Sequence, residues 1–151
     1  MTAERLQSWA VEAIRRSGWP AIALFAFHVI ASRGFHAYDH FPPLDIPMHI
    51  LGGIVIAYFY HGASVTASRC GIIGPFHRVT HIVLVLALTC TTTVFWEFGE
   101  FIVDRTFGTQ AQLGLEDTLK DMLLGICGGI ALILATQLGP RLLNKSETDV
   151  A

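Results

Sequence analysis

The sequence predicts an all-α membrane protein: a single integral membrane domain over residues 1–151, with about four transmembrane helices and an N-terminal amphipathic helix. Hydrophobic residues make up 52% of the chain and charged residues only 15%, and the mean hydropathy is +0.52. A soluble domain of this size has too much surface to carry that balance. The apolar residues also form long blocks, which is typical of a chain folded in a bilayer.

The N-terminal segment, residues 2–17, has helical periodicity. Leu6, Trp9 and Ile14 share one face, and charged residues occupy the others. This pattern predicts an amphipathic helix that lies in the membrane interface. The sequence Gly18-Trp19-Pro20 is expected to end it.

Four apolar segments follow, separated by turn-forming residues. The Pro42-Pro43 pair and the glycine-rich polar stretch 62–79 are expected to interrupt helices, and Gly139-Pro140 is expected to stop the last one before a short polar tail. The predicted spans are residues 19–35, 45–61, 80–103 and 117–138.

Lysine and arginine in the short loops predict the orientation. They concentrate at the N-terminus, in the middle loop and in the tail: Arg5, Arg15, Arg16, Arg69, Arg78, Arg141 and Lys145. By the positive-inside rule both termini are cytoplasmic, and the first and third connections face outward, in the inner membrane of a bacterium. The N-terminus lacks an apolar core followed by a small-residue cleavage site, so the first span is expected to serve as the insertion signal.

Several classes of function are disfavoured. The net charge of −2 offers no basic surface for nucleic acid. Cys90 and Cys127 lie in apolar blocks without metal-binding or redox spacing, where cysteine acts as a small hydrophobic residue. There is no GxSxG motif or glycine-rich phosphate loop, which argues against covalent and nucleotide chemistry.

Acidic residues gather at the ends of three predicted spans. Spacings of three or four residues place the members of each pair on one helix face. Given the predicted topology, all three pairs lie at the outer membrane level, where buried carboxylates are costly unless something compensates them. The pairs are Asp45 and His49, Glu97 and Glu100, and Asp117 and Asp121.

Small residues continue each polar face into its span, which lets helices approach closely. The carboxylates are therefore expected to point into the bundle and to line an acidic cavity open to the outer surface. The small residues are Gly52, Gly53 and Ala57 in the second span, Thr89 and Thr93 in the third, and Gly125, Gly128 and Gly129 in the fourth.

A divalent metal is the favoured occupant of this cavity, because carboxylates with histidine form the ligand sets of such ions in helix bundles. Zn, Mn, Fe and Mg all fit the predicted ligands. In this interpretation Asp45 is a general base, and Lys120 binds an anionic headgroup of a lipid-like substrate in a metal-dependent membrane enzyme. The predicted metal ligands are His49, Glu97, Glu100, Asp117 and Asp121.

Other interpretations remain open at this stage. The acidic residues can form a structural polar network in which Asp117 caps the last span and Glu100 pairs with Lys120. They can also form a proton or metal-ion pathway, or a docking surface for an accessory subunit of a larger membrane complex. Besides membrane lipids, the expected partners are such a complex or further copies of the chain.

Residues outside these pairs carry weaker signals. His28, in the first span, is expected to be a packed and hydrogen-bonded histidine. Gln110 and Gln112 either hydrogen-bond the acidic site or only form the turn between the last two spans. Three further histidines fall at the other membrane face and are expected at the surface: His61, His77 and His81.

Motifs in residues 44 to 130 resemble those of the YjdF-like family of small bacterial inner-membrane proteins, and more distantly those of VanZ-like membrane proteins. The resemblance implies a small polytopic membrane protein with an acidic motif set, and no particular reaction. In this sequence Asp45 is followed by Ile46-Pro47, where the family usually has an Asp-Lys pair before its histidine. The motifs are Asp45-x-x-x-His49, Trp96-Glu97-x-x-Glu100, Phe107-Gly108-Thr109-Gln110 and Asp117-x-x-x-Asp121-Met122, followed by Gly125 and Gly129.

Overall fold

The computed structural model describes the backbone of residues 2–148 and the side chains of residues 2–136. Within this part of the chain the structure is helical and has no strand, which confirms the all-α prediction. The α-helices are α1 (Ala3–Ala13), α2 (Trp19–Val29), α3 (Ala37–His40), α4 (Asp45–Arg69), α5 (Arg78–Phe107) and α6 (Leu115–Thr148). Two π-helical turns, η1 (Ile14–Gly18) and η2 (Ile30–Gly34), and a 3-10 turn, η3 (Pro42–Leu44), link the first helices.

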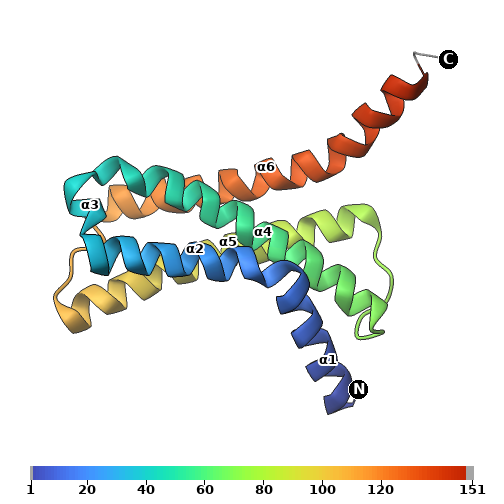
Figure 1. The fold of residues 1–151 in the computed structure, drawn as a ribbon, viewed down its shortest axis with the longest axis horizontal. Coiled ribbons are helices and arrows are strands. Elements are labelled where there is room, and N and C mark those ends of the chain that lie inside the picture. The colour runs from blue at the N-terminus through green and yellow to red at the C-terminus, as the bar shows by residue number, and fades with distance from the viewer. Residues whose placement is uncertain (1, 149–151) are drawn as a thin grey trace.

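The helices lie lengthwise in a bundle (Figure 1). α4 and α6 run in one direction, and α2 and α5 run in the opposite direction. One end of the bundle therefore collects α3, the start of α4, the end of α5 and the start of α6. Since every predicted acidic pair belongs to one of these helix ends, this end carries the candidate site.

Among the described residues, three helices are long and apolar enough to cross a membrane: Pro42–Arg69, Arg78–Phe107 and Leu115–Thr136. The first predicted span forms eleven residues of α2 and five of η2. At a rise of 1.5 Å per residue these cover about 24 Å, less than the roughly 30 Å of a hydrocarbon core. The chain is thus a multi-pass membrane protein with three candidate spans, and a fourth span stays a prediction.

The helices run further than the sequence patterns suggested. α4 continues from residue 61 to Arg69, because Gly62 does not break it. A Cβ at Gly62 would approach the Ser17 side chain, so this glycine serves close packing against η1. Likewise, Gly18-Trp19-Pro20 does not end the first helix, because the chain stays helical through the π-helical turn η1 into α2, with Pro20 just after that turn.

The expected stop at Gly139-Pro140 is also wrong. α6 continues to Thr148. A proline removes one helical hydrogen bond and can bend a helix without ending it. By contrast, Gly108 does end α5: its φ of 64° is left-handed, and its N–H donates to the Asp104 carbonyl.

Glycines bring α4, α5 and α6 together, as their spacing predicted. A Cβ at Gly53 would clash with the carbonyl oxygen of Gly125, so the α4 and α6 backbones touch there. On the other side of α6, Gly125 lies under the methyl group of Thr93 and Gly129 under that of Thr89. Gly52 differs from this prediction, because a Cβ there would meet nothing within 4 Å.

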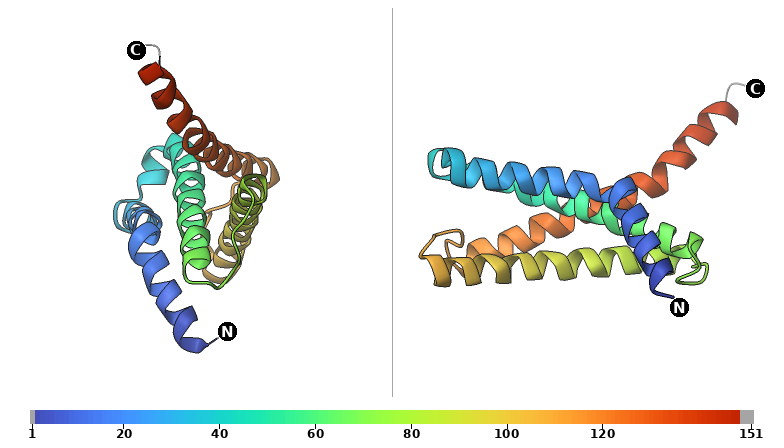
Figure 2. Two further views of the ribbon diagram at one scale, coloured as in Figure 1. Left: turned by 90° about the vertical axis from the view of Figure 1, so that its right-hand side faces the viewer. Right: turned by 60° about the horizontal axis from the view of Figure 1, so that its bottom comes forward.

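α1 turns away from the bundle at the end opposite α3 (Figure 2). It is tied to α4 by the Trp9 indole, whose Nε1 donates to the Ala63 carbonyl at 2.8 Å. The helix is mostly exposed. Its place in the membrane interface stays a prediction.

Candidate functional site

Asp45 and His49 occupy the first two turns of α4. Asp45 begins the helix directly after the 3-10 turn of Pro42–Leu44, and His49 follows one turn later on the same face. The His49 Nε2 lies 3.2 Å from the Asp45 Oδ1. The carboxylate and the imidazole are therefore paired, and both are largely shielded from solvent.

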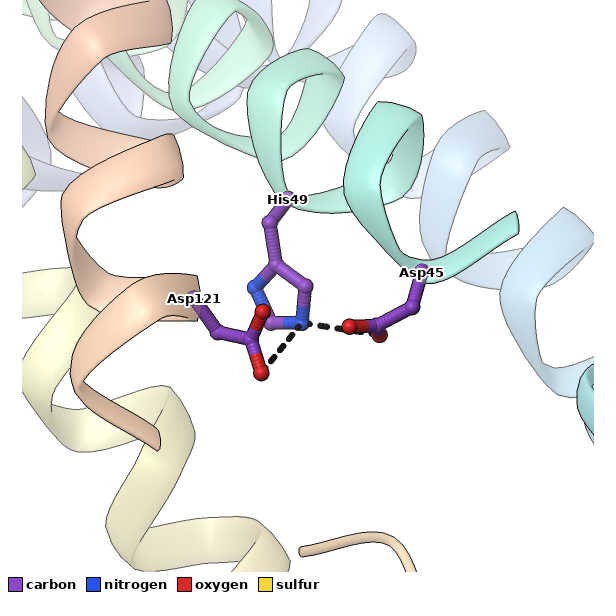
Figure 3. Close-up of side chains that lie close together, drawn as sticks. All are labelled: Asp45, His49 and Asp121. Atoms are coloured by element: carbon purple, nitrogen blue, oxygen red, sulfur yellow. Dashed lines mark ion pairs between the residues drawn. The ribbon is translucent and has the colours of Figure 1, made fainter. Parts of the chain in front are cut away.

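Asp121 reaches the same histidine from α6. Its Oδ2 lies 3.9 Å from the His49 Nε2, so one ring nitrogen faces two carboxylates (Figure 3). The contact between Gly53 and Gly125 lies one turn further along each helix. This close backbone approach brings His49 and Asp121 within reach of each other.

The Asp121 carboxylate is buried, and neighbouring groups balance its negative charge only in part. The residue is 4% exposed, and its Oδ1 has no hydrogen-bond partner among the described residues. Its nearest cation is the Lys120 Nζ at 3.6 Å, beyond hydrogen-bonding distance. An uncompensated buried carboxylate is expensive, which makes Asp121 the strongest single indication of a ligand.

Lys120 holds a position among three carboxylates. Its ammonium group contacts the Asp117 Oδ1 at 2.5 Å and lies 3.9 Å from the Asp45 Oδ2. Asp117 also accepts a hydrogen bond from the Leu113 N–H, across the start of α6. Asp117 thus ties the loop before α6 to the start of the helix and binds Lys120, so its capping of α6 stays a prediction, whereas Lys120 pairs with Asp117 and not with Glu100.

Glu97 is buried on the face of α5 that packs against α6. The residue is 4% exposed, and its Oε1 also lacks a hydrogen-bond partner in the described part of the chain. The Gln112 Nε2 donates to the Glu97 carbonyl at 2.9 Å and to its Oε2 at 3.2 Å. Of the two alternatives for Gln112, hydrogen bonding to an acidic residue is the one observed.

Asp104 organises the loop that delivers Gln112. Its carboxylate accepts hydrogen bonds from the Thr109 hydroxyl and from the N–H groups of Ala111 and Gln112. Asp104 therefore fixes the α5–α6 connection and, through Gln112, the environment of Glu97.

Helix register relates Glu97 to Asp121. Thr93 packs on Gly125 and Thr89 on Gly129, so α5 and α6 run antiparallel with a constant offset. One turn after Thr93 on α5 is Glu97, and one turn before Gly125 on α6 is Asp121, so these two residues lie at the same level. Two buried carboxylates thus occupy the same level of the α5–α6 pair.

Glu100 has a different hydrogen-bond partner, which lies toward α2. Its Oε1 accepts a hydrogen bond from the Trp96 Nε1 at 2.8 Å. The Trp96 ring makes an edge contact with His28 at 5.4 Å, and the His28 Nδ1 lies 2.7 Å from the Tyr38 hydroxyl. Burial and the nearby Asp45 carboxylate raise the pKa of Tyr38 to about 12, which keeps the phenol neutral. His28 is hydrogen-bonded, as expected.

A cavity of about 260 Å³ lies beside the site, between α2, α4 and α5. Asp45 and His49 line it near the start of α4, and Gly52 lines it one turn further on. The sequence analysis predicted an acidic cavity at this level, whereas the lining of the observed cavity is mostly apolar. Its only signals were a histidine inside an apolar segment and a tryptophan next to Glu97.

Of the predicted ligands, the structure brings together His49 and Asp121, joined by Asp45. One ligand atom from each of these three lies within 4.8 Å of the others, and they form the group of metal-ligating side chains found among the described residues. The remaining predicted ligands, Glu97, Glu100 and Asp117, surround this group with other partners.

The histidines at the opposite end differ in exposure. His77 is exposed, in accordance with the sequence analysis. His61 and His81 are half-buried: their rings stack at 4.9 Å between α4 and α5, and the His81 Nε2 lies 2.7 Å from the Ser64 hydroxyl. Surface exposure was therefore wrong for these two, because the neighbouring helix covers them.

Comparison with known families gives a match over most of the chain. Residues 8–139 match the model of a family described as predicted membrane protein (DUF2238). The chain belongs to this family of membrane proteins. Comparisons with curated proteins and with solved structures give no match.

Proposed function

We propose that this membrane protein binds a divalent metal ion through Asp45, His49 and Asp121. The unpartnered Oδ1 of the buried Asp121 carries the proposal, because a cation in the cluster would compensate it. Asp45 is then a ligand, in place of the general base that the sequence suggested.

The spacing of the three side chains supports a shared ion. Tetrahedral coordination at bond lengths of 2.0 to 2.2 Å separates neighbouring ligand atoms by about 3.4 Å. The His49 Nε2 lies 3.2 and 3.9 Å from the two carboxylates, so small side-chain rotations would complete the site. Three protein ligands leave positions open for water or substrate, and two carboxylates with one imidazole suit Zn, Mn or Fe.

One observation favours a second candidate, a metal-free structural network. The Lys120 ammonium lies within 4 Å of Asp45, Asp117 and Asp121 and supplies positive charge to the cluster. In this case the site would hold α4 and α6 in register, as in an accessory subunit of a larger complex.

The cellular membrane, the orientation of the chain and its relationship to YjdF-like proteins are proposed from the sequence. The distribution of lysine and arginine supports cytoplasmic termini in a bacterial inner membrane, with the site at the outer face. The motifs shared with YjdF-like proteins support a relationship to that group. A metal with open positions at this level suits hydrolysis or another reaction on a lipid-like molecule.

The test is the metal content of the protein purified in mild detergent, after incubation with Zn, Mn, Fe or Mg and dialysis, measured by mass spectrometry. Asp121→Asn is compared with Glu116→Gln, which removes the same charge from an exposed position in the first turn of the same helix. We expect a stoichiometric metal in the wild type and in Glu116→Gln, and its loss from Asp121→Asn. Equal metal content in both variants, or an empty wild type, would favour the Lys120 network.

A further inference from the structure

We propose that the cavity between α2, α4 and α5 binds one hydrocarbon chain of a membrane lipid, with the lipid's polar end at Asp45 and His49. The proposed metal site concerns only that polar end, and the chain-binding site rests on separate observations.

The cavity is apolar along its length and polar at one end. Leu24, Val55 and Ile56 line its deeper part, and Asp45 and His49 line its outer part. From residue 45 to residue 56, α4 rises by roughly 16 Å. A lipid in the same leaflet has the same polarity, with its headgroup at the surface and its chain directed inward.

The two threonine hydroxyl groups in the cavity wall already donate hydrogen bonds within their own helix. The Thr92 Oγ1 donates to the Leu88 carbonyl, and the Thr93 Oγ1 donates to the Cys90 carbonyl, each within the helix. Among the described residues, these two threonines therefore have no donor left for a ligand. This is the lining that suits a hydrocarbon chain and disfavours a polar solute.

The size of the cavity suits a single chain. An engineered 150 Å³ protein cavity with apolar walls holds benzene, so 260 Å³ corresponds to on the order of ten carbon atoms. Met48, whose flexible thioether adapts to irregular shapes, also lies in the wall.

The rim of the cavity is aromatic and exposed. Phe25 is 54% exposed and Trp96 is 36% exposed, although both line the cavity. Their rings meet edge to face at 6.1 Å, across the gap between α2 and α5. In a bilayer this rim faces lipid, so a chain can enter from the membrane.

The test is photolabelling of the full-length protein in phosphatidylcholine nanodiscs. The probe is a palmitic acid analogue that carries a diazirine in the middle of its chain, and labelled residues are mapped by mass spectrometry. We expect stronger labelling at Leu24, Met48 and Ile56 than at Leu123, an exposed side chain on α6. Labelling of the cavity residues no stronger than that of Leu123 would overturn the proposal without any variant.

Two glycine variants sharpen the test. Gly52→Leu places a side chain in the cavity, and Gly99→Leu is the matched control, because a Cβ meets nothing within 4 Å at either position and Gly99 does not line the cavity. We expect Gly52→Leu to reduce cavity labelling at least fivefold and Gly99→Leu to leave it unchanged. Unchanged labelling in a folded Gly52→Leu variant would contradict the proposal.

Metal content measured in the same samples separates the two proposals. A metal-free wild type whose cavity labelling depends on Gly52 would refute the metal site and support the chain site. A metal-loaded wild type with uniform labelling would do the reverse.

Discussion

Gly52 and Gly53 are neighbours on α4 with opposite surroundings. Gly53 presses against the carbonyl oxygen of Gly125, so the α6 side of α4 is closed backbone to backbone, although both of these glycines also contribute to the cavity lining. Gly52 faces the α2 side, where it lines the cavity and leaves space. One helix thus has a tightly packed face and an open face, a single residue apart.

The difference shows how the candidate site is built. The closed face sets the distance between His49 and Asp121, because the glycine contact lies one turn away from both. The open face gives Asp45 and His49 access to a space bounded by aromatic rings. Positioning and access therefore come from opposite sides of α4.

The largest effect is expected from filling the closed face. Gly53→Leu must push α6 away from α4, because the clash is with backbone, and overpacking typically costs about 1–3 kcal/mol. We expect loss of the folded protein or of its metal, measured by circular dichroism during heating and by metal content. Gly52→Leu is the control and should leave both unchanged. Equal tolerance of the two substitutions would show that the faces do not differ.

Glu97→Gln tests whether the second buried carboxylate belongs to the metal site. We expect unchanged metal content and a free energy of unfolding higher by about 1 kcal/mol, because a buried amide costs less than a buried carboxylate. Metal analysis and thermal unfolding of the purified variant measure both. Loss of the metal would instead make Glu97 a ligand, as the sequence analysis predicted.

How far the sequence anticipates these faces depends on the kind of feature. Repeated small residues predicted the close contacts of Gly53, Gly125 and Gly129, because spacing along a helix determines which residues share a face. The same reasoning assigned Gly52 to the packed face. Whether a helix covers a residue depends on the path of α2, which its sequence does not specify.

The acidic cluster shows the same limit. Its location at one end of three spans followed from topology and spacing. Which residues belong to the cluster could not be predicted in this way, because it depends on their side-chain partners. Gln112 and Trp96 donate hydrogen bonds to Glu97 and Glu100, and Lys120 forms an ion pair with Asp117. These contacts depend on the conformation of the loop that Asp104 organises and on side-chain rotamers. Neither can be deduced from the spacing of residues along the sequence.

Lys120→Met removes the cation that competes with a metal at the edge of the closed face. Its ammonium lies 3.6 Å from Asp121 and 3.9 Å from Asp45, so its loss should strengthen metal binding about tenfold, or about 1.4 kcal/mol. Titration of the metal-free protein with Zn measures the change. Lys120→Arg retains the charge and should bind as the wild type does. Weaker binding by Lys120→Met would indicate that Lys120 positions the carboxylates.

The smallest effect is expected at the open face, from Tyr38→Phe. The raised pKa of Tyr38, about 12, means that the folded state keeps its proton at a pH where the unfolded state, with a pKa near 10, loses it. This contribution to stability is complete below about pH 10 and falls as the pH rises toward 12. Wild-type melting temperature should therefore decline over this window, and Tyr38→Phe should decline less. Parallel declines would show that the phenol is solvated, and that the open face does not shield the His28–Tyr38 pair from water.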